Sequence, residues 1–117
     1  MSVHSRPDLA SLVGDELSAI CFVRDYVELH FDGPVLRLMG SVSLNRDDRD
    51  LKLGADDEFF GAIHKAIGRT LVAVGQSDKA LSVTFDDRLR ICSSAGTNGC
   101  EYAHFVSFPE KRLFVWD

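Results

Sequence analysis

The sequence predicts an α+β fold: an antiparallel sheet, curved or split in two, covered by helices and completed by an extra C-terminal hairpin. Three observations support this expectation. Apolar and polar residues alternate along several short segments, as they do in half-buried strands. The connections between these segments are of hairpin length, which implies antiparallel pairing. One amphipathic segment near the middle of the chain carries the apolar stripe of a helix.

Length and composition indicate one domain, residues 1–117. Apolar residues make up 45% of the chain and charged residues 26%, the usual globular mixture. A chain of this length can bury a core without disulfides or metal. No apolar run is long enough to span a bilayer, and residues 1–7 are polar where a signal peptide is apolar. We therefore expect a cytoplasmic protein.

The second half of the chain partly repeats the first at an offset of 54 positions (68 − 14). Five identities fall within the twenty positions 14–33, where about one is expected by chance. The identical pairs are Gly14/Gly68, Leu17/Leu71, Ala19/Ala73, Phe31/Phe85 and Asp32/Asp86. We therefore expect two degenerate copies of a helix-plus-three-strand unit, at about residues 7–44 and 58–93.

The first copy is expected to contain a short helix and three strands. Pro7 suits a first helical turn, and Gly14 suits a left-handed helix cap. The three strands are predicted at residues 16–23, 26–32 and 36–44. In the first strand, the residues predicted to share one face are Leu17, Ala19, Cys21 and Val23. Gly40 interrupts the third strand, which predicts a bulge or bend there.

The second copy begins with the best helix signal in the chain. Asp56 or Asp57 is expected to cap its N-terminus, and Gly68 to end it. Its predicted apolar stripe consists of Phe59, Phe60, Ile63 and Ile67, and we expect this stripe to cover the sheet. Strands are predicted at residues 70–76, 80–86 and 88–93.

An extra hairpin follows at residues 100–116, with its turn at residues 109–112. Together with the two copies it brings the expected total to eight strands and two helices. The last strand, residues 113–116, is apolar on both faces. Such a strand is typical of the centre of a sheet or of a dimer interface.

Residues 45–58 are expected to link the two copies and to be the main partner-binding surface. Three basic residues oppose six acidic ones here, which leaves −3 of the total net charge of −5. The acidic residues are Asp47, Asp48, Asp50, Asp56, Asp57 and Glu58. Such a surface favours a basic partner and disfavours nucleic acid. A calcium loop is not expected, because the ligand order differs and basic residues intervene.

The polar face of the strand at residues 26–32 is a second candidate binding surface. It carries Tyr26, Glu28 and His30, and aromatic residues among charges suit protein interfaces. The alternative interpretation is a solvated strand face. Glycosidase chemistry is not expected, because Glu28 and Asp32 lie too far apart along a strand.

Cysteine and histidine chemistry was weighed as a third possibility. Cys92, Cys100 and His104 do not have the spacing of a four-ligand zinc site, so no metal is expected. A nucleophilic pair of Cys100 with His30 would define a hydrolase. The other interpretation is that the cysteines are small buried apolar residues. No phosphate loop or nucleophile elbow is present in the sequence, and no cofactor is expected.

Two segments, Asp25-Tyr26-Val27-Glu28-Leu29-His30-Phe31-Asp32 and Leu113-Phe114-Val115-Trp116-Asp117, resemble parts of small uncharacterised bacterial α+β domains. Some of those domains are grouped with immunity proteins of polymorphic toxin systems. The resemblance implies a non-enzymatic domain that sequesters a toxin, possessing no catalytic residues of its own. Two alternatives stay open from the residues: a small-ligand-binding or dimerising module, and a Cys/His hydrolase. No membrane partner is expected, and a homodimer remains compatible with the last strand.

Overall fold

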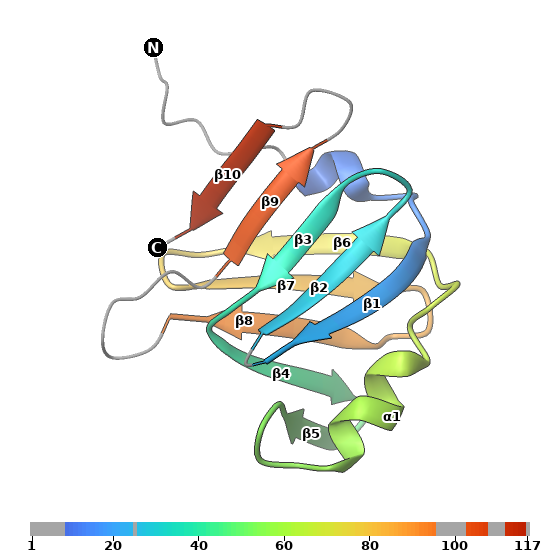
Figure 1. The fold of residues 1–117 in the computed structure, drawn as a ribbon. Coiled ribbons are helices and arrows are strands. Elements are labelled where there is room, and N and C mark those ends of the chain that lie inside the picture. The colour runs from blue at the N-terminus through green and yellow to red at the C-terminus, as the bar shows by residue number, and fades with distance from the viewer. Residues whose placement is uncertain (1–8, 25, 96–102, 108–111, 117) are drawn as a thin grey trace.

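A computed structural model describes residues 9–24, 26–95, 103–107 and 112–116, with the last two ranges described as backbone apart from Ala103. These residues form ten strands in two antiparallel five-stranded sheets, together with one α-helix and one 3-10 helix. Figure 1 shows one sheet in front of the other, its strands running diagonally across those behind. The α+β class and the antiparallel pairing are therefore confirmed.

The front sheet has the strand order β1-β2-β3-β9-β10. The 3-10 helix η1 (Leu9–Leu12) precedes it. Its strands are β1 (Leu17–Val23), β2 (Tyr26–Phe31), β3 (Val35–Leu38), β9 (Ala103–Ser107) and β10 (Arg112–Trp116). The C-terminal hairpin thus extends the sheet of β1, β2 and β3, because β9 pairs with β3. The expected hairpin residues 100–102 and 108–111 lie outside the described ranges.

The rear sheet has the strand order β5-β4-β8-β7-β6. The helix α1 (Glu58–His64) lies between β5 and β6 in the chain. The strands are β4 (Ser41–Arg46), β5 (Arg49–Lys52), β6 (Leu71–Gln76), β7 (Ala80–Phe85) and β8 (Arg90–Ser94). β4 pairs with β8, so the chain that leaves β3 continues in the sheet of β6, β7 and β8.

Gly40 marks a crossing between the sheets, and the prediction of one strand over residues 36–44 is wrong. The chain leaves the front sheet after Leu38 and enters the rear sheet at Ser41. The N–H of Gly40 donates a hydrogen bond to the hydroxyl of Ser93, which is fully buried. This contact with a residue of β8 satisfies a backbone donor at the point where the chain passes from one sheet to the other.

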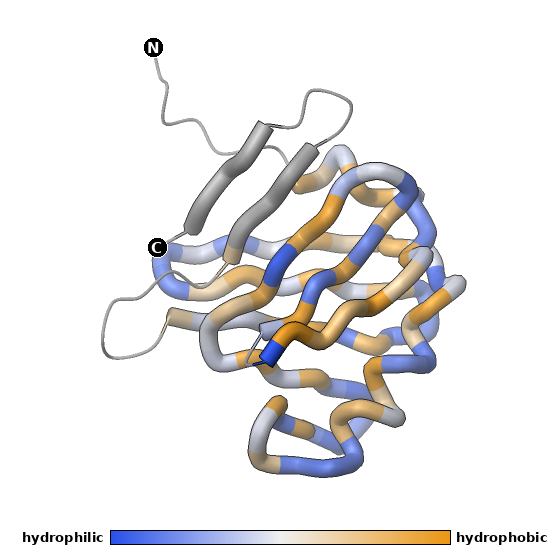
Figure 2. The backbone as a smooth tube through the Cα atoms, viewed as in Figure 1, coloured by the Kyte–Doolittle hydropathy of each residue, from blue (hydrophilic) through white to orange (hydrophobic). Residues whose placement is uncertain are grey.

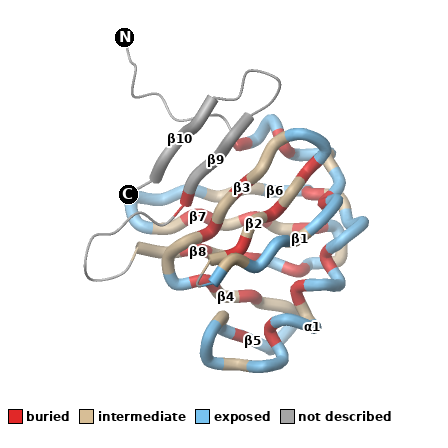
Figure 3. Tube along the Cα trace, viewed as in Figure 1, coloured by how far each residue is buried: buried red, intermediate tan, exposed pale blue. Residues whose placement is uncertain are grey.

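The strands form two sheets, which is the split alternative of the expected curved or split sheet, and these sheets cover each other. The expectation that helices cover the sheet is thereby corrected. Buried side chains from both sheets form one apolar cluster. Figures 2 and 3 show apolar, buried positions alternating with polar, exposed ones along the strands. The helix α1 lies at one end of this sandwich against β4 and β5. Each sheet therefore buries one face against the other, as in aligned or crossed sheet packings.

The helix α1 is shorter than expected and buries only half of its predicted stripe. Phe59 and Ile63 are fully buried, whereas Phe60 is 47% exposed and Ile67 37% exposed. Asp57 occupies the N-cap position without a side-chain hydrogen bond to the helix, so the predicted carboxylate cap is wrong. No helix in the described part of the chain is long and apolar enough to cross a membrane.

The edge strands β1 and β6 each contain a bulge, which reverses the predicted face of β1. The register of β1 on β2 shifts between Leu17 and Ala19, so Ile20 pairs with the buried Leu29 and Cys21 with Glu28. Leu17 is buried, whereas Ala19 and Cys21, which were predicted to share its face, are exposed. A bulge inserts one residue, and each residue after it changes faces. The corresponding shift in β6 falls between Leu71 and Ala73.

Equivalent residues of the two halves form reciprocal backbone hydrogen bonds where η1 and α1 lead into the sheets. The N–H of Gly14 donates to the carbonyl of Leu71, and the N–H of Gly68 donates to the carbonyl of Leu17, both at 2.8 Å. The N–H groups of Leu17 and Leu71 donate to Arg69 and Asp15, at 3.0 and 2.9 Å. Gly14 and Gly68 have positive φ angles, +100° and +89°. The two halves therefore meet through matched contacts.

The last strand, β10, is an edge strand in the described structure, which corrects its predicted central position. It pairs with β9 only, at the end of the front sheet (Figure 1). Its apolar sequence had two interpretations, a central strand or a dimer interface, and the central-strand interpretation is wrong. The dimer interface remains a proposal.

Candidate functional site

Half of the segment predicted as a linker, residues 45–58, lies in strands or the helix, and turns connect these parts. It contains the end of β4, all of β5 and the start of α1. Arg46 pairs with Arg49 in the register, so Asp47 and Asp48 form a two-residue hairpin turn. Asp47 has a φ of +55°. Aspartate tolerates this left-handed conformation better than most residues, which explains how a turn without glycine forms here.

This hairpin and the start of α1 bring the six predicted acidic residues onto neighbouring elements. Arg49 on β5 forms an ion pair with Glu58, the first residue of α1. The backbone N–H of Lys52 donates to a carboxylate oxygen of Asp56 at 2.9 Å. Five of the six are exposed and Asp56 is half-buried. We call these six residues, Asp47, Asp48, Asp50, Asp56, Asp57 and Glu58, the acidic surface.

Some carboxylates of the acidic surface bond to other residues of the protein, and the others have no such bond within the described ranges and can contact a partner protein. Asn45 donates to a carboxylate oxygen of Asp50 at 2.7 Å across the β4–β5 pair. Asp47, Asp48 and Asp57 make no ion pair or side-chain hydrogen bond with the described residues. An exposed carboxylate without an internal partner keeps its charge for an incoming cation.

The second predicted group, Tyr26, Glu28 and His30, lies on the outer face of the front sheet. They alternate along β2 with Val27, Leu29 and Phe31, which are buried in the core. The carboxylate of Glu28 accepts hydrogen bonds from His30 Nε2 at 3.0 Å and from Arg37 Nε at 2.8 Å. Arg37, on the neighbouring strand β3, was not among the predicted site residues.

Glu28 titrates below its usual range because of these two partners. Burial is the largest single influence and raises the pKa of the Glu28 carboxyl. The hydrogen bonds and positive charges of His30 and Arg37 together outweigh it, so the pKa is lowered from 4.5. Glu28 is therefore an ionised, internally bonded carboxylate, and it is a poor proton donor or acceptor near neutral pH.

The structure does not bring the two predicted groups together. Tyr26, Glu28 and His30 belong to β2 in the front sheet, whereas the acidic surface belongs to the β5 edge of the rear sheet. Figure 1 shows β5 and α1 at the bottom of the molecule, below the strands of the front sheet. They are therefore two separate surfaces and not one composite site.

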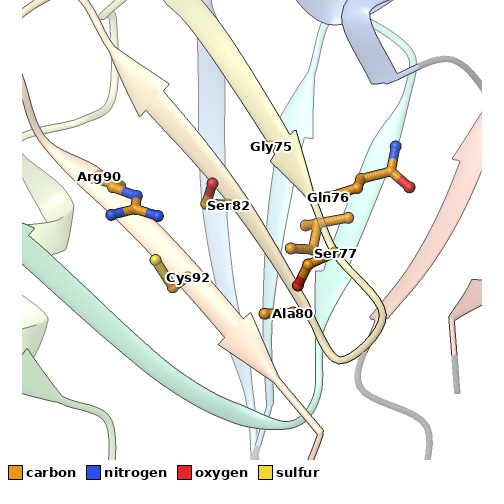
Figure 4. A pocket seen from close by; sticks show the side chains of 8 residues that line it. Gly75, Gln76, Ser77, Ala80, Ser82, Arg90 and Cys92 are labelled. Carbon is orange, nitrogen blue, oxygen red and sulfur yellow. The ribbon is translucent and has the colours of Figure 1, made fainter.

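A shallow hollow of about 230 Å³ lies on the outer face of the rear sheet. Figure 4 shows Arg90 and Cys92 on β8 beside Ser82 on β7. Burial is the main reason that the pKa of the Cys92 thiol is raised above 9.0, and Asp50 adds to it, while the charge of Arg90 opposes it. A thiol held protonated is a weak nucleophile and a weak metal ligand.

The predicted cysteine and histidine chemistry otherwise falls largely outside the described residues. Cys100 is not described, and His104 is described in its backbone only. Cys21 is exposed on β1. Within the described ranges, no three His, Cys, Asp or Glu side chains are grouped as metal ligands.

A second pocket, also of about 230 Å³, lies between the β4–β5 hairpin and α1. Sequence analysis did not find it. Its apolar lining consists of Leu44, Leu51, Ala62 and Leu89, and its charged lining of Arg46, Asp47, Arg49 and Lys65. We call this the cationic pocket. In the sequence Arg46 and Arg49 lie among the acidic residues of 45–58, whereas Lys65 lies near the end of the expected helix. No local spacing predicts that these three residues line one cavity.

Comparisons with protein-family models, with curated proteins and with solved structures gave no match to this chain.

Proposed function

We propose that this protein is a non-enzymatic binding domain whose acidic surface contacts a basic protein partner. The observation that carries the proposal is the position of the six acidic residues on the β4–β5 hairpin and the start of α1. The Arg49–Glu58 ion pair and the Lys52–Asp56 hydrogen bond hold these elements together. Exposed like charges on an ordered surface speed encounter with a partner of opposite charge.

The more specific form of the proposal is an immunity protein that sequesters a basic toxin domain in the cytoplasm. An acidic surface suits this role because a toxin that acts on nucleic acid exposes basic groups to bind phosphate. The resemblance noted in the sequence supports this form. Tyr26, Glu28 and His30 would then provide a second contact surface on the front sheet.

We further propose that the two halves of the chain are copies of one unit. The reciprocal hydrogen bonds of Gly14 and Gly68 support this, as do the matching bulges in β1 and β6. The hairpins that follow support it too: β4–β5 follows β3 and pairs with β8, and β9–β10 follows β8 and pairs with β3. The acidic surface lies mainly on the β4–β5 hairpin, which the first half of the chain contributes to the rear sheet.

The first experiment is the capture of partners from a lysate of the native host at low and moderate salt. We expect one basic protein in stoichiometric amount, lost as the salt concentration rises. The association rate of the purified pair is then measured for the variant Asp47→Asn/Asp48→Asn/Asp50→Asn. We expect association slowed by about tenfold at low salt, with a weaker salt dependence.

The matched control carries the same charge change elsewhere: Glu16→Gln/Asp32→Asn/Asp78→Asn. All three residues are exposed, and they lie before β1, between β2 and β3, and between β6 and β7. If long-range net charge alone governed association, both triple variants would slow it equally. Equal slowing, or no slowing by either variant, would refute a role for the acidic surface.

A second candidate function, self-association through β10, is favoured by the position of that strand. β10 has one described neighbour and an apolar sequence from Leu113 to Trp116. An unpaired apolar edge is a ready template for another strand. We expect a dimer by light scattering at high protein concentration if this function holds, and a monomer after Val115→Lys. A monomer at every concentration would exclude it.

A further inference from the structure

We propose that the cationic pocket is a binding site for a small amphiphilic anion, a molecule with an apolar body and one carboxylate or similar anionic end. This site adjoins the acidic surface, with which it shares Asp47, and its ligand does not depend on the proposed protein partner. The argument rests on the lining of the pocket, on the ion pairs that position its cations, and on the one cation left unpaired.

The pocket has an apolar lining drawn from four parts of the fold. Leu44 is on β4, Leu51 on β5, and Leu89 immediately precedes β8; all three are at least nine-tenths buried. Ala62 on α1 completes this lining with a small side chain. At about 230 Å³ the cavity lies below the roughly 300 Å³ at which pockets for drug-sized ligands begin. It therefore fits a short apolar chain or a single small ring.

Three cations and one carboxylate provide the charged part of the lining: Arg46, Arg49, Lys65 and Asp47. The lining itself carries three positive charges and one negative charge, in a protein whose net charge is −5. An apolar cavity with a few polar groups at its boundary is the usual form of a small-molecule site. Here the polar groups select an anionic end, because guanidinium and ammonium groups donate charge-assisted hydrogen bonds to carboxylates and phosphates.

Two of the cations are held in place by carboxylates. A guanidinium nitrogen of Arg46 lies 3.6 Å from Asp87 Oδ2, and the side chain of Asp87 is 8% exposed. Asp87 is itself fixed by the N–H of Leu89, which donates to its other oxygen at 3.3 Å. Arg49 is paired with Glu58. Positioning these side chains before binding reduces the conformational entropy that a ligand must remove.

Lys65 has no ion pair with the described residues and is exposed. It follows α1 directly and is one of the residues that line the pocket. It is thus the cation whose charge is not already neutralised. Asp47 opposes an anion from the hairpin turn, so Lys65 and Asp47 are expected to influence affinity in opposite directions.

The test uses octanoate as the probe, below its micelle concentration, titrated into the full-length protein and followed by backbone amide shifts in NMR. We expect saturable shifts at Leu44, Leu51, Ala62 and Leu89. Octanol tests the need for the charge and acetate the need for the apolar body. Both are expected to bind at least about tenfold more weakly.

Variants on either side of the pocket sharpen the test. Lys65→Gln is expected to weaken octanoate binding about fivefold, and Asp47→Asn to strengthen it about twofold. Asparagine tolerates the positive φ at position 47, so the turn is preserved. Lys79→Gln removes an equally exposed charge from the β6–β7 connection and is expected to change nothing. Ala62→Leu fills the cavity and is expected to abolish saturation.

Three results would overturn the proposal. The first is the absence of saturable shifts with octanoate. The second is binding of octanol as tight as that of octanoate. The third is affinity for octanoate that Lys65→Gln and Ala62→Leu both leave unchanged, which would place the probe elsewhere on the protein.

Discussion

The rings of Phe31 and Phe85 lie nearly parallel, at an interplanar angle of 10°, with their centroids 6.5 Å apart. Phe31 ends β2 in the front sheet and Phe85 ends β7 in the rear sheet. Both are almost completely buried, at 3% and 1% exposure. The two residues are equivalent under the 54-residue offset, so one pair of identical residues joins the two sheets across the core.

Replacing these phenylalanines tests whether the ring pair couples the sheets. We expect Phe31→Leu and Phe85→Leu each to lower the free energy of unfolding by about 1–1.5 kcal/mol. The double variant should lose less than the sum of the two, by about 0.5–1 kcal/mol, because each single change already removes the ring contact. Urea unfolding of all four proteins measures this coupling.

The control combines Phe31→Leu with Leu51→Val; Leu51 is on β5, three places from β7 in the rear sheet. These two losses should add within about 0.5 kcal/mol. Additive losses for Phe31 and Phe85 as well would show that the stacked geometry contributes nothing beyond burial.

Replacing Gly14 or Gly68 by alanine is expected to lower the stability of the protein by similar amounts. An added Cβ would meet nothing within 4 Å at either position, so only the positive φ angles oppose it. We expect Gly14→Ala and Gly68→Ala each to cost about 1–2 kcal/mol of stability. Thermal and urea unfolding would measure these losses.

Gly61 in α1 is the matched control, since a Cβ there also meets nothing within 4 Å and its φ is not positive. Gly61→Ala should stabilise the protein by about 0.5–1 kcal/mol, because alanine is the better helix former. A cost at position 61 similar to those at 14 and 68 would mean that space, and not backbone conformation, limits all three positions.

Glu28 is expected to make stability depend on pH. Its pKa is lower in the folded protein than the usual 4.5, so its contribution is complete above that value and is lost as the pH falls through the folded pKa. We expect Glu28→Gln to reduce the free energy of unfolding by about 1 kcal/mol at pH 7. The difference between the two proteins should shrink towards pH 3, as followed by urea unfolding.

Glu58→Gln provides the comparison, because Glu58 and Arg49 are 68% and 60% exposed. Exposed ion pairs contribute little, so this variant should stay within about 0.5 kcal/mol of the parent at both pH values. A difference for Glu28→Gln that is the same at pH 7 and pH 3 would contradict the role assigned to its hydrogen bonds.

Parts of the candidate site could be predicted from local pattern and parts could not. The alternation in β2 predicted that Tyr26, Glu28 and His30 share a face, and the burial pattern confirms it. Arg37 was missed because its contact with Glu28 depends on the β2–β3 register. The cationic pocket was missed because Arg46, Lys65 and Leu89 come from segments that only the tertiary structure brings together.

By itself the sequence determined the type and approximate position of most strands, because hydrophobic alternation is a local property with a period of two. It also determined the antiparallel class, since short connections allow little else. Only the tertiary structure decided that Gly40 is a crossing between sheets, that β1 contains a bulge, and that β10 lies at an edge. Each of these depends on which strands pair and in what register, and that choice is made by packing between residues far apart in the chain.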